Sequence, residues 1–203
     1  MTNALTINNL PPIASLDLYI QAVNRIPLLS ASEELGLAKR LKEEEDLDAA
    51  KSLVMSHLRL VVSIARRFNG YGLPFGDLIQ EGNVGLMKAV KRYDFENGAR
   101  LVSFAMHWIK AEIHEFVLKN WRIVKLATTK AQRKLFFNLR SMRSSLDTLN
   151  NDEIDRISHK LDVKPTDVTE METRMSGADL ALDPLSLNED DDYSPLSYLP
   201  SPD

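Results

Sequence analysis

One segment of the chain combines aromatic and basic side chains at helical spacing. Residues 102–119 are expected to form a helix with one aromatic side that has basic residues beside it. The residues on and beside that side are Phe104, His107, Trp108, Lys110 and His114. The adjoining stretch, residues 119–143, holds eight Lys or Arg and no Asp or Glu. Rings that stack on bases, next to cations that hold phosphates, suit single-stranded nucleic acid. The segment therefore indicates a nucleic-acid partner.

The other side of the same helix carries an apolar stripe that is expected to face a core. Its members are Val102, Ala105, Ile109, Ile113, Phe116 and Val117. A helix that is apolar on two sides is usually buried on both, so periodicity alone leaves burial of the aromatic side as an alternative. Trp121, among Lys119, Arg122 and Lys125, is equally suited to anchor a domain junction or to contact DNA.

The charge is distributed unevenly along the chain. The net charge of −4 divides into −3 for residues 1–56, +10 for residues 57–143 and −11 for residues 144–203. Such asymmetry indicates a polyanion partner for the middle segment, although a solvated basic face is the plainer alternative. The absence of cysteine fits a cytoplasmic protein, and no apolar run is long enough to predict a membrane span.

The sequence offers little support for an enzyme. The four histidines do not form a metal-ligand pattern, and His114-Glu115 is not followed by the second histidine of a zinc-protease motif. No glycine-rich phosphate loop and no nucleophile–base pair stands out. We therefore expect neither catalytic residues nor a metal or cofactor.

The periodicity predicts an all-α fold. Helices are expected over about residues 16–23, 31–45, 47–68, 77–93, 102–119, 129–145, 151–161 and 165–176. We expect four segments: a flexible leader over 1–14, a helical domain over 15–127, a three-helix domain over 128–177 and an acidic disordered linker over 178–203. The last two predicted helices resemble a helix-turn-helix, but an ordinary three-helix bundle is equally compatible with them.

Longer motifs in the middle of the chain resemble conserved region 2 of primary-type bacterial sigma factors. They cover residues 57–67 (HLRLVVSIARR), 72–74 (GLP), 77–90 (DLIQEGNVGLMKAV), 93–95 (YDF) and 103–110 (SFAMHWIK). Residues 131–140 (AQRKLFFNLR) resemble the segment peculiar to heat-shock sigma factors. The resemblance extends over about residues 15–177 and implies regions 1.2 and 2 followed by a region 3 domain.

The resemblance implies a docking surface for core RNA polymerase. The helix that begins near Asp77 would bind the clamp helices of the β′ subunit. Its implied contact residues are Asp77, Leu78, Ile79, Gln80, Glu81, Asn83 and Met87. We further expect the helix-breaking Gly82 and Gly85 to allow a close approach of that partner helix.

The resemblance also implies binding to promoter DNA, especially the −10 non-template strand. Phe104 would capture a flipped adenine, and Trp108 with His107 would act at the upstream edge of the bubble. Further implied contacts are Lys110, His114, Lys119, Arg122, Lys125, Lys130 and Arg133. Because Ala111 and His114 replace the Gln and Thr of housekeeping members, a different −10 preference is expected.

Several other expectations depend on the same resemblance. Residues 188–192 resemble the start of the finger that enters the polymerase active-site channel. The chain stops at Asp203, before the domain that binds the −35 element, so full promoter recognition is not expected. Control by chaperones and a regulatory protease is implied. Two alternatives remain: a competitor that docks on core without supporting initiation, and a general DNA-binding helix-turn-helix protein.

Overall fold

The structure, a computed structural model, describes residues 16–143, 148–177 and 179 and is all-α over these residues. The expected leader therefore lies outside the described residues, and so does the acidic linker except for Asp179. The described residues form two compact units that divide between Lys125 and Leu126.

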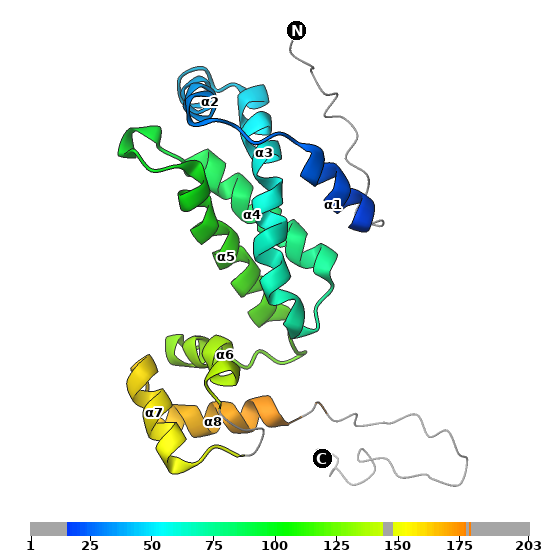
Figure 1. Cartoon of the computed structure of the whole chain (residues 1–203). Coiled ribbons are helices and arrows are strands. Elements are labelled where there is room, and N and C mark those ends of the chain that lie inside the picture. Colours follow the sequence, from blue (N-terminus) through cyan, green and yellow to red (C-terminus); the bar gives the residue numbers. More distant parts are fainter. Residues whose placement is uncertain (1–15, 144–147, 178, 180–203) are drawn as a thin grey trace, which may run out of the picture. The chain divides into compact units, whose positions relative to one another are not determined.

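The first unit contains five α-helices and two short 3₁₀ helices. They are α1 (Leu16–Arg25), α2 (Ala31–Glu44), α3 (Leu47–Ala65), η1 (Arg66–Tyr71), α4 (Phe75–Arg92), η2 (Phe95–Asn97) and α5 (Leu101–Asn120). In Figure 1, α3, α4 and α5 lie side by side, while α1 and α2 pack against α3. The expected helix over 47–68 ends earlier, at Ala65, and continues as η1.

The helix starts follow local capping chemistry. The Ser30 hydroxyl accepts a hydrogen bond from the Glu33 N–H, and the Glu33 carboxylate accepts one from the Ser30 N–H, which confirms the predicted capping box of α2. The Asp46 carboxylate caps α3 by accepting from the N–H groups of Asp48 and Ala49. These caps satisfy backbone donors that have no partner inside their own helices.

The core of the first unit lies between α3, α4 and α5. Its largest fully buried side chains are Leu53, Leu78, Ile79, Leu86, Leu101, Ile109 and Ile113. Two glycines of α4 allow this packing. A Cβ on Gly85 would lie 2.8 Å from both Ile109 Cα and Trp108 O, and a Cβ on Gly82 would lie 2.5 Å from Val61 Cγ1.

The expectation that a polymerase helix approaches α4 at these glycines is therefore wrong. Gly82 and Gly85 are both buried, and the close neighbours belong to α3 and α5 of the same unit. The loss of helix propensity that each glycine brings is offset by packing within the chain.

The second unit consists of α6 (Lys130–Met142), α7 (Asn151–Leu161) and α8 (Pro165–Ser176). Thr129 with Gln132 and Asn150 with Glu153 form capping boxes at the starts of α6 and α7. The three helices bury a core of Leu135, Phe136, Leu139, Ile157, Val168 and Met171. Helix α6 was expected to run to about residue 145, but it ends at Met142.

Candidate functional site

One side of helix α5 is buried in the core of the first unit, and the other side faces away from that core. Its fully buried residues are Leu101, Ala105, Ile109, Ile113 and Val117. The predicted stripe was wrong at its first position, because Val102 is 38% exposed and Leu101 takes its place in the core. Phe116 is only half-buried. The rest of the stripe is confirmed, so the aromatic side of α5 points away from the core.

Three aromatic side chains line up along that outer side. The ring centroids of Tyr93 and Phe104 lie 6.0 Å apart, and those of Phe104 and Trp108 lie 6.1 Å apart. All three side chains are half-buried. The guanidinium carbon of Arg92 lies 4.6 Å from the centroid of the Trp108 ring, within cation–π range. We call Tyr93, Phe104 and Trp108 the aromatic platform.

The platform extends beyond the residues that were identified from the sequence. Tyr93 and Arg92 come from the end of α4, so helical periodicity within α5 could not reveal them. His107, which lies between Phe104 and Trp108 in the sequence, is exposed. The rings of the aromatic platform are thus accompanied by the guanidinium of Arg92 and the exposed imidazole of His107.

The next turns of α5 carry Lys110 and His114, both half-buried. The His114 ring meets the Phe68 ring edge-on, with centroids 5.1 Å apart. Burial lowers the pKa of His114, and the nearby Lys110 charge lowers it further. His114 is therefore neutral at neutral pH, and the positive charge at this position comes from Lys110.

The lowered pKa of His114 predicts a pH-dependent loss of stability. Below about pH 6.5 the unfolded chain protonates this histidine more readily than the folded chain, so the free energy of unfolding falls as pH drops. His114→Gln removes this contribution. Between about pH 7.5 and 5.5, thermal unfolding followed by circular dichroism should show a larger fall in Tm for wild type than for the variant. An equal fall in Tm for wild type and His114→Gln would contradict a lowered pKa of His114.

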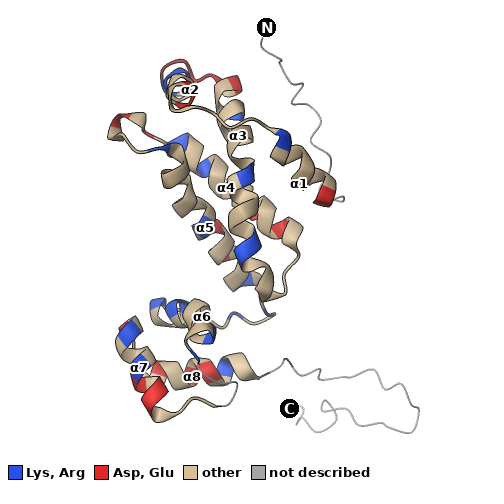
Figure 2. Cartoon of the chain, in the orientation of Figure 1, with Lys and Arg blue, Asp and Glu red and all other residues tan. Residues whose placement is uncertain are grey.

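The remaining predicted DNA contacts are distributed over both units. Lys119 lies in the last turn of α5 and forms an ion pair with Glu115 at 2.7 Å. The Arg122 guanidinium carbon lies 4.7 Å from the centroid of the half-buried Trp121 ring. Lys125 is exposed in the first unit. Lys130 and Arg133 are on α6 of the second unit, where Figure 2 shows a concentration of Lys and Arg.

The predicted polymerase surface occupies the outer face of α4. Asp77, Gln80 and Met87 are exposed, and Glu81 is half-buried. Gln80 and Glu81 lie three and four residues after Asp77, and Met87 lies seven residues after Gln80, so these positions share one side of the helix. The assignment of Leu78 and Ile79 to this surface was wrong: both side chains are 0% exposed and belong to the core between the helices.

Asn83 lies at the edge of the same stripe and also contacts another helix. Its side-chain amide donates hydrogen bonds to the Tyr19 hydroxyl and to Gln80 Oε1, each at 3.3 Å. Tyr19 is buried on α1. Asn83 therefore connects the candidate polymerase surface to α1.

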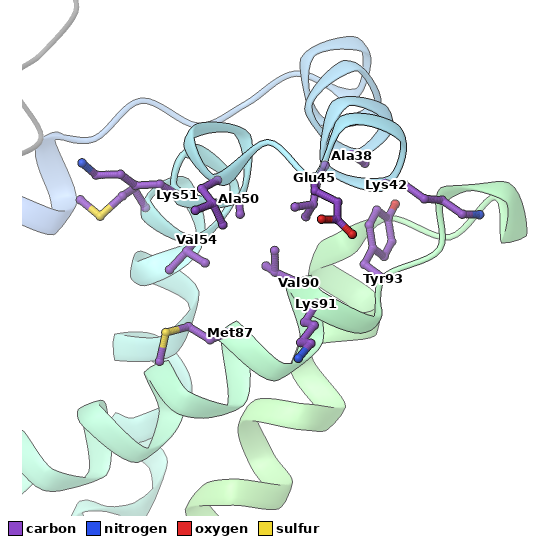
Figure 3. Close-up of a pocket in the computed structure, with 13 residues that line it drawn as sticks. Ala38, Lys42, Glu45, Ala50, Lys51, Val54, Met87, Val90, Lys91 and Tyr93 are labelled. Atoms are coloured by element: carbon purple, nitrogen blue, oxygen red, sulfur yellow. The ribbon is translucent and has the colours of Figure 1, made fainter.

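A groove of about 950 Å³ opens beside Met87, at the other end of the α4 stripe. Figure 3 shows Val54 and Val90 toward its floor, with Lys42, Lys51 and Lys91 around it. Leu47 also lines the groove and is 81% exposed. The groove is thus an apolar surface between α2, α3 and α4, with three lysines and Glu45 among the residues that line it.

The loop between α4 and α5 is held by α2 at two points. At the surface, Lys42 Nζ forms ion pairs with Asp94 at 2.9 Å and Glu96 at 3.2 Å. In the interior, the Glu34 carboxylate binds Arg100 and the Leu101 N–H. Glu34 was not identified from the sequence, although it lies four residues before the buried Ala38 on the core stripe of α2.

Among the described residues, no cluster of three or more His, Asp or Glu side chains is arranged to hold a metal ion. The part of the chain that the structure describes also contains no helix with the length and apolarity needed to cross a membrane.

Comparison with known proteins identifies two conserved regions in the first unit. Residues 15–47 match the family Sigma-70 factor, region 1.2, and residues 53–123 match the family Sigma-70 region 2. The aromatic platform and the stripe on α4 both lie within the second match.

A curated relative extends the similarity into the second unit. The chain is 45% identical over 185 residues to the RNA polymerase sigma factor RpoH of Caulobacter vibrioides, an alignment that covers 89% of this chain. The chain spans about 62% of the length of that relative. The resemblance to heat-shock sigma factors that the sequence motifs indicated is thereby confirmed. With both conserved regions and a long alignment in agreement, the chain belongs to the sigma-70 family of RNA polymerase sigma factors.

Proposed function

We propose that this chain is an initiation factor of the heat-shock class that binds core RNA polymerase, recognises the −10 promoter element and promotes opening of the DNA strands. The aromatic platform is the single observation that carries this proposal. It presents half-buried rings on the outer side of α5, next to Arg92 and Lys110. Family membership and the similarity to a named polymerase sigma factor support it further.

The energetics of strand opening fit the platform. Extracting a base from a duplex costs a few kcal/mol. Stacking of a base on an aromatic ring recovers about 1–3 kcal/mol, and cations contribute by holding the phosphates. Two rings that each receive a base, together with phosphate contacts from neighbouring cations, therefore offset the local opening. Phe104 and Trp108 are the rings that we assign to this role.

The outer face of α4 supports docking on the β′ clamp helices. Asp77, Gln80 and Glu81 offer carboxylate and amide groups, and Met87 adds an apolar contact that is 51% exposed. Acidic and amide groups beside an apolar residue are complementary to a basic helical partner. In contrast to Leu78 and Ile79, these side chains are accessible without unfolding α4.

Replacing Gln80 with Ala and Glu81 with Arg should weaken binding to core polymerase by about tenfold, or about 1.4 kcal/mol. The change removes an amide and reverses a charge at the proposed interface. The matched control is Glu44→Arg, which makes the same charge reversal on the exposed face of α2. Affinity is measured by titrating labelled chain with core, and thermal unfolding checks the fold. If both variants bind like wild type, α4 is not the docking surface.

A runoff assay on an extended −10 or pre-melted heat-shock promoter tests the proposed function. We expect a transcript when core polymerase and the chain are combined, and none with either alone. Binding to core without any transcript would overturn the proposal that the chain promotes initiation. Control by chaperones and a regulatory protease is proposed on the heat-shock resemblance alone.

A further inference from the structure

Helix α5, which carries most of the aromatic platform, begins without a cap of its own. Its N-cap residue is Arg100, whose side chain makes no capping hydrogen bond. By contrast, α2, α3, α6 and α7 each use the side chain of their own N-cap residue. The first N–H groups of a helix have no partner within that helix. The N–H of Leu101 instead donates to Glu34 Oε1 at 2.7 Å, across from α2.

The second oxygen of the same carboxylate binds the N-cap residue. Arg100 donates to Glu34 Oε2 from Nε at 3.1 Å and from Nη2 at 2.8 Å. His57 Nε2 on α3 lies 3.9 Å from this oxygen. Glu34 is 2% exposed, whereas the Arg100 side chain is 51% exposed. A buried carboxylate thus meets a backbone donor, a guanidinium and an imidazole at the start of α5.

The charge state of Glu34 suits this role. Burial alone raises the pKa of the carboxyl, but hydrogen bonds from Arg100 and the Leu101 N–H outweigh burial, and the resulting pKa is lowered. Glu34 is therefore ionised at neutral pH. A negative charge at the first turn of a helix is favourable because the N-terminal N–H groups form the positive end of the helix dipole.

The backbone that Glu34 holds leads directly to the platform. The Phe104 N–H donates to the Arg100 carbonyl at 3.2 Å, so Phe104 closes the first turn of α5. The Tyr93 hydroxyl donates to the Ala99 carbonyl at 2.6 Å. A displacement of Arg100 or Leu101 therefore moves both Phe104 and the loop that orients Tyr93.

We propose that Glu34 is a positioning residue: its carboxylate caps α5 from α2 and thereby fixes the geometry of the aromatic platform. The function of the platform in strand opening rests on the proposed function above. The capping itself does not, because it concerns contacts within the chain. The two are therefore tested with separate measurements.

Glu34→Gln preserves the size of the side chain and removes its charge. The amide oxygen still reaches one donor, but the attraction between a carboxylate and the Arg100 guanidinium is lost. For the chain bound to core polymerase, affinity for a single-stranded −10 non-template oligonucleotide should fall about tenfold, while affinity for core should stay within about twofold. Lys42→Met is the matched control, since it removes the exposed anchor of the same loop and should change oligonucleotide affinity less than about twofold.

A second substitution separates capping from a general structural role. Arg100→Asp gives α5 a capping side chain of its own. In the Glu34→Gln background, Arg100→Asp should restore most of the lost oligonucleotide affinity. In the wild-type background, the same substitution places two carboxylates together and should lower affinity. If Glu34 only supported packing, Arg100→Asp would not have opposite effects on oligonucleotide affinity in the two backgrounds.

The geometry of the platform is measured without DNA. The chain contains two tryptophans, so incorporation of 5-fluorotryptophan with Trp121→Phe leaves Trp108 as the single fluorine probe. We expect its resonance to shift or broaden in Glu34→Gln and to return in Glu34→Gln with Arg100→Asp. An unchanged resonance in Glu34→Gln, or a failed return with Arg100→Asp, would overturn the capping role.

Folding and function are kept apart in this design. Circular dichroism and thermal unfolding monitor the fold, and Glu34→Asp provides a milder variant whose shorter side chain should shift the resonance by an intermediate amount. If Glu34→Gln does not fold, Glu34→Asp alone decides: a wild-type resonance would refute capping. If wild type fails to bind the oligonucleotide, the proposed function fails, while the fluorine spectra still test Glu34.

Discussion

Replacing Phe104 and Trp108 together with alanine is expected to slow promoter opening about a hundredfold, while binding to core polymerase stays within about twofold. Each ring offers stacking worth about 1–3 kcal/mol, and about 2.8 kcal/mol corresponds to two powers of ten in rate. The rings lie on the outer side of α5, whereas the stripe that is proposed to bind core lies on α4. Opening is followed by stopped-flow fluorescence of a labelled promoter.

The matched control is Phe116→Ala. Phe116 is also a half-buried aromatic residue of α5, but it lies about three turns beyond Phe104 and outside the aromatic platform. We expect this variant to open promoters at close to the wild-type rate. If Phe116→Ala slows opening as much as the double variant does, or if the double variant loses core binding equally, the rings act through the fold and not through DNA.

Gly85→Ala is expected to destabilise the first unit by about 3 kcal/mol, at the upper end of the usual cost of overpacking. The added Cβ would lie 2.8 Å from Ile109 Cα and from Trp108 O, which are backbone atoms that cannot rotate away. Helices α4 and α5 must therefore separate. The free energy of unfolding is measured by urea denaturation followed by circular dichroism.

Gly36→Ala serves as a control that is expected to have the opposite effect on stability. Gly36 lies inside α2, and nothing is found within 4 Å of a Cβ at that position. Higher helix propensity should therefore stabilise this variant, by about 1 kcal/mol at most. A Gly85→Ala variant that is as stable as wild type would show that α4 and α5 tolerate a wider spacing, and it would leave the glycine without a packing role.

The sequence predicted the helices well because their boundary signals are local. Capping boxes such as Ser30 with Glu33 depend on residues three positions apart, and the structure contains them. The buried stripe of α5 was predicted from periodicity except at its start, where the core residue is Leu101 and not Val102, and at the half-buried Phe116. A one-residue error at a helix end is expected when no side-chain cap marks the start, as is the case at Arg100.

The contacts between distant segments could not be predicted in the same way. The sequence showed Gly82 and Gly85 in α4, but only the structure shows that their neighbours are α3 and α5. Periodicity placed Phe104 and Trp108 on one side, whereas Tyr93 joins them from the end of another helix. Glu34 meets Leu101 across 67 positions of sequence, and no local pattern encodes that pairing.

Permanganate footprinting of promoter complexes tests the central claim most directly, because it detects unpaired thymines. With core polymerase and the wild-type chain, we predict reactive thymines within the −10 element. With the Phe104→Ala, Trp108→Ala double variant at equal core occupancy, we predict that this reactivity is lost. Equal reactivity of wild type and the double variant would contradict the assignment of strand opening to the aromatic platform.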